Sequence, residues 1–152
     1  MMKRSRIRLP WQLGAIPGIA LVVFLAACGG GGAREFKVTL KEWSVTPDLA
    51  EVSPGKVQFV VTNDGTEPHE MVIIRSDLSP QGLPVVDGKV DEEKVEVVDE
   101  IDAFAAGTTE RKTVELEAGK YILICNIVEN VPGQPVKSHY ENGMRTTFLV
   151  GQ

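Results

Sequence analysis

The chain has 152 residues, of which 43% are hydrophobic and 24% are charged, and its net charge is −5 at neutral pH. This length allows one domain with a sizeable core. The acidic balance excludes nucleic acid as an expected partner, because nucleic-acid-binding domains present a basic face.

Residues 1–27 predict an export signal. Four basic residues precede an apolar run from Trp11 to Ala27, which prolines interrupt and which is short for a membrane-spanning helix of about 20 residues. The run ends in small residues before Cys28, which looks like a bacterial lipobox, so we expect Cys28 to be lipidated. The alternative is an ordinary cleaved signal that contains a cysteine. We therefore expect a signal peptide at 1–27, a lipidated, glycine-rich tether at 28–34 and a domain at 35–152.

Removal of the signal would make the chain more acidic. Residues 1–27 hold four of the 16 basic residues and none of the 21 acidic ones, which leaves 12 against 21 and a charge of −9. If Cys28 is lipidated, Cys125 has no disulfide partner within the chain. A lone thiol outside the cytoplasm is either a buried, inert small hydrophobe or a thiol held by a metal.

Alternation of apolar and polar residues predicts strands from residue 36 onward. Phe36, Val38 and Leu40 define the first strand, and we expect Trp43 and Val45 to continue it past a bulge. Further strands, separated by turns rich in proline, glycine and asparagine, are expected at residues 56–62, 71–74, 108–116, 121–125 and 146–150.

Residues 76–101 have a mixed pattern. Proline and glycine predict a loop at 76–88, and for 90–101 we expect a short helix or an irregular excursion, although Val95 and Val97 alternate as in a strand. About seven strands with little helix indicate an all-β fold, a two-sheet Greek-key β-sandwich. The strand pattern alone fits an immunoglobulin-like sandwich as well.

Four residues in the chain have the types and the order of a copper-ligand set. Cys125 ends one expected strand, His139 and Met144 precede the next, and His69 precedes the strand at 71–74. Two imidazoles, a thiolate and a weak axial thioether form a type 1, or blue, copper site. Singly, each residue could be an ordinary core or surface residue. Together they predict one copper ion per chain.

Over residues 36–150 the sequence resembles the cupredoxins, the superfamily of plastocyanin and azurin. The most specific part is Tyr121-x-x-x-Cys125 followed by His139-x-x-x-x-Met144 and a closing strand. The resemblance implies a cupredoxin-like sandwich, the four ligands named above and electron transfer as the function.

Two features depart from that family. Asparagine often follows its first histidine, whereas here Glu70 does, and Asn126 follows the cysteine. We expect Glu70 to accept a hydrogen bond from Asn126 and so to fix the site geometry, the alternative being a solvated carboxylate. The loop of 13 residues between Cys125 and His139 is long, and we expect it to fold over one side of the copper and shape the partner surface. An exposed edge of His139 is therefore not assumed.

These expectations describe a blue-copper electron carrier, tethered to the bacterial membrane by lipid on its periplasmic or cell-surface side. Its partners would be redox proteins such as a basic cytochrome or oxidase, which could dock on the acidic segment at residues 87–102. The alternatives are a copper-delivery or storage lipoprotein that serves a cuproenzyme, and a metal-free scaffolding domain. We expect no enzymatic activity, because copper enzymes of this type need further ligands and the chain has only two histidines. The sequence carries no signal for or against self-association.

Overall fold

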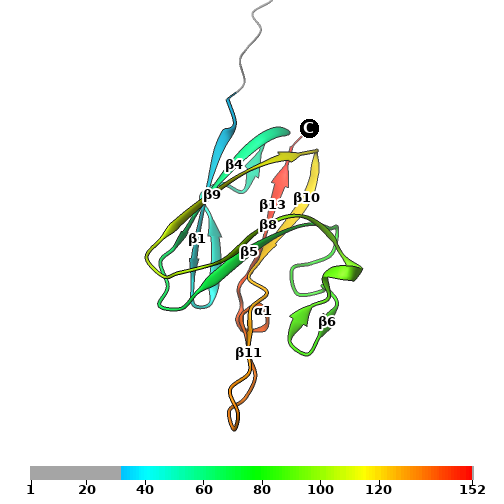
Figure 1. Ribbon diagram of the computed structural model, residues 1–152. Coiled ribbons are helices and arrows are strands. Elements are labelled where there is room, and N and C mark those ends of the chain that lie inside the picture. The colour runs from blue at the N-terminus through cyan, green and yellow to red at the C-terminus, as the bar shows by residue number, and fades with distance from the viewer. Residues whose placement is uncertain (1–31, 152) are drawn as a thin grey trace, which may run out of the picture.

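A computed structural model of the chain describes residues 32–151, which form a β-sandwich (Figure 1). In spatial order the strands of the first sheet are β2 (Ser44–Pro47), β1 (Arg34–Lys41), β4 (Gly55–Asn63) and β9 (Thr109–Leu116). Those of the second sheet are β3 (Glu51–Val52), β13 (Arg145–Val150), β10 (Gly119–Ile124), β5 (His69–Arg75) and β8 (Glu96–Phe104). The predicted two-sheet sandwich is confirmed. The expected export signal and Cys28 lie outside the described residues.

The shorter elements lie on the second sheet or beyond its ends. They are β6 (Val85–Val86), β7 (Lys89–Val90), the 3-10 helix η1 (Glu92–Lys94), β11 (Val128–Glu129), β12 (Lys137–Ser138) and α1 (His139–Asn142). Among residues 32–151, no helix is both long and apolar enough to cross a membrane.

Aromatic rings fill the space between the two sheets. Phe36 of β1 packs edge-on against Phe59 of β4 (ring centroids 5.4 Å apart), and both contact Phe148 of β13, which stacks on Tyr121 of β10. All four are at most 2% exposed. Burial of these large side chains, each worth roughly 1.5–3 kcal/mol or more, holds the sheets together.

The two central strands of the second sheet, β5 and β10, are buried on both faces, which explains their continuous apolar runs. Met71 and Ile73 of β5 face the aromatic core, while Val72 and Ile74 belong to a second cluster on the opposite face. Leu83, Val90 and Tyr140, from the 76–95 excursion and α1, cover that second face. A strand that is covered on both sides has no polar face and therefore shows no alternation.

The expected continuation of the first strand through Val45 is wrong. The chain reverses at Glu42 and Trp43, and β2 runs antiparallel to β1 with Leu40 paired to Val45. Both side chains are buried. A two-residue turn keeps the same alternation as a bulged strand, so the sequence pattern does not separate the two cases.

The expected helix or irregular excursion at 90–101 is replaced, for the most part, by a strand. Only η1 is helical there, and β8 pairs with β5 along the edge of the second sheet. Its register shifts between Ile73 and Ile74 of β5 and again near His69. Such irregularities change which side chains face inward, and they break the period of two that identifies a strand.

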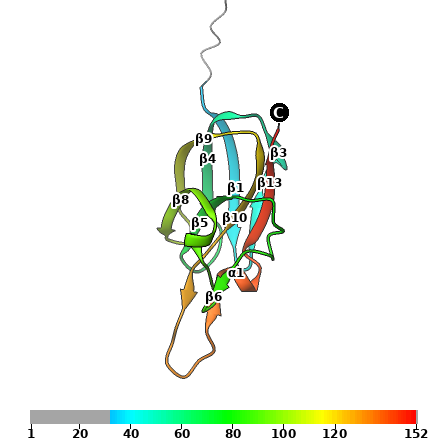
Figure 2. The same cartoon turned by 90° about the vertical axis from the view of Figure 1, so that its right-hand side faces the viewer.

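Residues 126–138 form a protruding β-hairpin, which we call the arm. It is built on the pairing of β11 with β12, and it extends away from the sandwich at the end opposite to the first described residues and the C-terminus (Figure 2). The arm begins directly after Cys125 and ends directly before His139, so the expected metal ligands lie at its base.

Candidate metal centre

Three potential metal ligands meet at the arm end of the sandwich. His69 begins β5, Cys125 directly follows β10, and His139 begins α1. Because β5 and β10 are hydrogen-bonded neighbours, the first two are placed side by side by the sheet itself. All three side chains are completely buried.

The donor atoms of these residues point at one another. His69 Nδ1 lies 3.1 Å from His139 Nδ1, and the Cys125 sulfur lies 3.3 Å from His139 Nδ1 and 3.9 Å from His69 Nδ1. Donors that share one ion at about 2.0–2.3 Å are separated by distances of this size. The three therefore form a triangle that one metal ion can fill.

The outer nitrogen of each ring is held by a carboxylate. Nε2 of His69 lies 3.1 Å from Glu42 Oε1, and Nε2 of His139 lies 3.1 Å from Glu129 Oε1. A neutral imidazole that donates through Nε2–H presents a bare lone pair at Nδ1. Two lone pairs then face each other across 3.1 Å. A cation between them resolves this conflict, so the donor set fits a metal ion.

Burial keeps the Cys125 thiol protonated in the absence of a metal. Desolvation is the largest effect and raises the pKa of Cys125 to about 11, although hydrogen bonds from backbone amides oppose it. A thiolate, not a thiol, is the metal ligand. Metal binding therefore releases this proton, and the single S–H cannot satisfy both facing imidazoles on its own.

Met144 lies next to both the cysteine and the second histidine. It is fully buried in the same core cluster as Cys125. Its backbone amide donates to the His139 carbonyl at 3.0 Å, and its carbonyl accepts from the Cys125 amide at 3.0 Å. The turn between them uses Gly143 at φ 130°, where a Cβ would lie 2.8 Å from the Trp43 carbonyl oxygen. A glycine is needed there for both reasons.

The turn between β1 and β2 covers both histidines. Glu42 Oε1 accepts hydrogen bonds from the amides of Thr66 and Glu67 as well as from His69. Burial opposes ionisation of Glu42, but these amide hydrogen bonds outweigh it and lower its pKa to about 2. The Trp43 ring packs edge-on against the His139 ring with centroids 5.1 Å apart.

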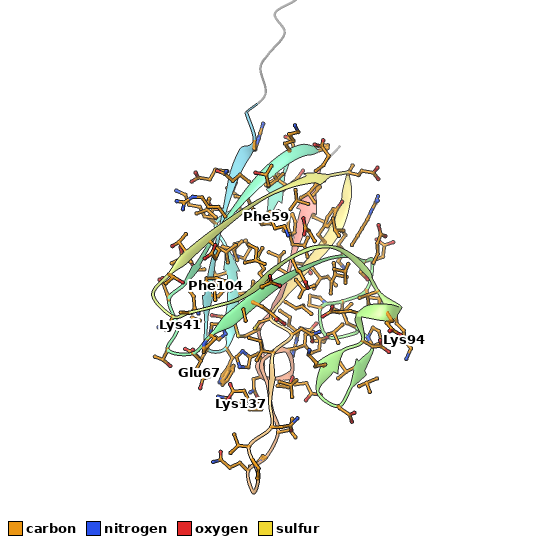
Figure 3. The ribbon with its side chains drawn as sticks, viewed as in Figure 1. Lys41, Phe59, Glu67, Lys94, Phe104 and Lys137 are labelled. Atoms are coloured by element: carbon orange, nitrogen blue, oxygen red, sulfur yellow. The ribbon has the colours of Figure 1, made fainter. Side chains whose placement is uncertain are left out.

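The arm covers His139 from the other side. Lys137 lies 2.9 Å from Glu129 and 2.6 Å from Glu67. Figure 3 shows Glu67 and Lys137 side by side at the base of the arm. Glu67, Glu129 and His139 also have the spacing of a metal-binding group. The Lys137 ammonium already supplies a cation to both carboxylates, so this group is an ion-pair network that covers the imidazole.

Glu70 and Asn126 tie the site to the excursion on the second sheet. The backbone amide of Asn126, not its side chain, donates to Glu70 Oε1 at 2.9 Å. The Asn126 side chain accepts from the Val90 amide at 2.7 Å and donates to the Val90 carbonyl at 3.0 Å and to Glu92 Oε1 at 2.7 Å. Burial raises the pKa of Glu70, which the Asn126 amide partly offsets.

Comparison with solved structures finds auracyanins and an azurin. Auracyanin from Roseiflexus castenholzii matches with a TM-score of 0.54 at 16% identity, covering 80% of this chain and 100% of that one. Auracyanin A from Chloroflexus aurantiacus, described as a "blue" copper protein, gives 0.51 at 18% identity over 79% of this chain and 100% of that one. Azurin from Methylomonas sp. strain J gives 0.50 at 16% identity over 80% and 100%. The chain has the cupredoxin fold.

Sequence comparison finds a different relative. Over 116 residues, 76% of this chain, it is 26% identical to the iron uptake system component EfeO of Yersinia pestis, and a similar match is found in Yersinia pseudotuberculosis. The chain spans only 26% of the length of that relative. No protein-family model matches the sequence.

Sequence reasoning missed the residues that cover the histidines. The sequence predicts a continued strand at Glu42 and Trp43, which instead form a turn. It predicts a loop at Glu129 and Lys137, which instead pair in the hairpin of β11 and β12. A carboxylate can reach an imidazole from any loop that passes nearby. The only available signal was the length of the segment between Cys125 and His139.

Proposed function

We propose that this protein binds one type 1 copper ion through His69, Cys125 and His139, with Met144 as the axial ligand, and carries single electrons outside the cytoplasm. The observation that carries the proposal is the buried triangle of two Nδ1 atoms and one sulfur. Imidazole and sulfur ligands favour copper, and a thioether suits copper far better than zinc, whose structural sites use four firm ligands.

The residues present a site suited to electron transfer. Bound copper would supply a Cu(I)/Cu(II) couple, which exchanges one electron at a time. The protein holds the ligands rigidly, because His69 and Cys125 are fixed by neighbouring strands and His139 by α1 and the arm. Complete burial of all three side chains excludes water from the ligands. A rigid, dry site needs little rearrangement when the charge of the ion changes.

The expected export signal and lipobox support a location outside the cytoplasm, anchored through lipid on Cys28. The similarity to a component of an iron uptake system is consistent with a location outside the cytoplasm. The partners would be redox proteins, such as a basic cytochrome or oxidase. We propose a carrier rather than an enzyme, since a copper ion held by the triangle with Met144 as a fourth ligand would have no open position for substrate.

A second candidate is a metal-handling role within an uptake system, which includes copper delivery or storage. The match to EfeO favours it. Burial of the ligands speaks against rapid transfer of the ion, because an acceptor must reach the metal in order to exchange ligands.

The test is to add Cu(II) to the purified full-length protein and to record visible absorption and voltammetry. An intense thiolate-to-copper band with a reversible one-electron couple supports the carrier. Binding of Cu(I) alone with rapid loss to a chelator supports delivery instead. Tighter binding of iron or zinc than of copper would overturn the copper assignment.

A further inference from the structure

Both candidate copper-binding imidazoles are held at their outer nitrogen by a carboxylate from a different part of the chain. Glu42 reaches His69 from the β1–β2 turn, and Glu129 reaches His139 from the arm, each at 3.1 Å. The two carboxylates are 18% and 38% exposed, whereas the imidazoles are fully buried. The ring edges therefore contact negative charge rather than solvent.

We propose that Glu42 and Glu129 are positioning residues for the copper centre. They hold His69 and His139 in the Nε2–H tautomer, with Nδ1 free to bind metal, and their negative charge favours Cu(II) over Cu(I). The first part concerns the protein itself, and the second rests on the proposed function.

The contacts of Glu42 make it a fixed acceptor. One carboxylate oxygen receives the amides of Thr66 and Glu67 at 2.8 and 3.0 Å in addition to His69. Those amides belong to the segment that leads directly into β5, so the orientation of the His69 ring is tied to the backbone next to it. A ring held in this way cannot rotate to present its other nitrogen without breaking the hydrogen bond.

Glu129 differs because a cation shares it. Lys137 bridges Glu129 and Glu67, and its ammonium lies 5.7 Å from the centre of the Trp43 ring that packs against His139. Lys137 therefore reduces the negative field at His139 that Glu129 creates. The two residues should change the copper potential in opposite directions.

The sign of each effect follows from electrostatics. A carboxylate that accepts the Nε2 hydrogen makes the imidazole a stronger donor. A stronger donor and a nearby negative charge stabilise the ion of higher charge more, which lowers the reduction potential. Loss of the Glu129 charge should raise the potential, and loss of the Lys137 charge should lower it.

The experiment uses substitutions that keep shape and change charge. Glu129→Gln and Glu42→Gln keep an acceptor oxygen, Lys137→Gln removes the cation, and Glu115→Gln on β9 of the other sheet is the control with the same change in net charge. For the two site carboxylates we expect Cu(II) affinity to fall about 10–100-fold with a smaller loss for Cu(I). Each tenfold fall in the affinity for Cu(II) relative to that for Cu(I) raises the reduction potential by about 59 mV.

A second measurement needs no copper. Nitrogen-15 correlation spectra of the metal-free protein report which ring nitrogen carries the hydrogen. We expect Nε2–H at both His69 and His139 in the wild type, and a mixture of tautomers at His139 in Glu129→Ala, whose fold is checked by circular dichroism. The Glu115→Gln control should match the wild type.

Three results would overturn the inference. The first is an Nδ1–H tautomer at either ring of the wild type. The second is that the reduction potentials of the Glu129 and Glu42 variants change no more than that of the control, and the third is that the reduction potential of the Lys137 variant changes in the same direction as that of Glu129→Gln. If Glu42→Gln does not fold, the Glu129 and Lys137 pair decides. If the wild type binds no copper, the proposed function fails, while the tautomer spectra still decide the positioning role.

Discussion

The backbone amide of Cys125 donates a hydrogen bond to the backbone carbonyl of Met144, with the two atoms 3.0 Å apart. Met144 in turn donates to the His139 carbonyl at the same distance. The three residues are thus joined by main-chain hydrogen bonds that need no metal. We therefore expect the ligand loop to keep its shape when a single ligand side chain is changed.

Replacement of Cys125 by serine should remove the intense visible band of the copper protein and leave the fold intact. The thiolate is the source of that band, and serine is close to cysteine in size. Visible absorption of the copper-loaded variant and circular dichroism check the two parts. A serine variant that keeps the band would show that Cys125 is not the ligand.

Replacement of Met144 by leucine should retain copper and raise the reduction potential. Leucine fills a similar buried volume, so the core is conserved, but it offers no electron pair. Loss of a weak axial donor destabilises Cu(II) more than Cu(I). Voltammetry of both proteins measures the change. An unchanged potential, or complete loss of copper, would contradict the axial role.

Replacement of Asn126 by alanine should destabilise the protein. Its side chain is the partner of both the amide and the carbonyl of Val90, which is itself only 3% exposed. Each buried polar group left without a partner costs about 1–3 kcal/mol, so the free energy of unfolding should fall by at least ~2 kcal/mol. Urea denaturation measures it, with Asn130→Ala on the exposed part of the arm as the control. Equal stabilities of the two variants would exclude this anchoring role.

The candidate ligand set could be derived from the sequence because it depends on residue type and order. One cysteine, two histidines and a methionine are rare enough that their spacing points to one class of site, and the structure brings His69, Cys125 and His139 together. Strands with one face toward solvent could also be predicted, because their apolar and polar residues alternate along the sequence. β4, for example, alternates along most of its length.

The covering of the site could not be predicted, because it depends on contacts between distant segments. Glu42 and His69 are 27 positions apart, and a turn that the alternation conceals brings them together. The strand β8 was concealed as well, by its register shifts and by acidic residues along an exposed edge. Local patterns carry neither kind of information.

Replacement of Cys28 by alanine, or inhibition of lipid transfer to it, should release the protein from the membrane fraction. Two anchoring signals are usually needed for stable attachment, and diacylglycerol supplies two acyl chains. Fractionation of cells followed by immunodetection measures the distribution. Wild-type protein that is already soluble after lysis would refute the lipobox.

The acidic segment at 87–102 remains the best candidate surface for a redox partner. The segment is connected to the candidate metal centre, because Asn126, which directly follows Cys125, donates a side-chain hydrogen bond to Glu92. Some of its charge is already paired, as in the Asp91–Lys94 and Asp99–Lys112 ion pairs. The His139 edge is covered by the arm, so a partner gains no direct access to that ring.

Docking on this segment should make electron transfer to a cationic cytochrome fall steeply as salt is added. Complementary charge mainly accelerates encounter, and the screening length is about 8 Å at physiological ionic strength. Glu92 is left unchanged because it bonds Asn126. The test variant replaces three exposed residues of the segment by glutamine: Glu93, Glu96 and Glu100. The control variant makes the same change at three exposed residues elsewhere: Glu35, Glu51 and Glu115. Stopped-flow rates across a salt series should show a shallower slope for the test variant alone. Equal slopes for both variants would place docking elsewhere, with the arm as the next surface to examine.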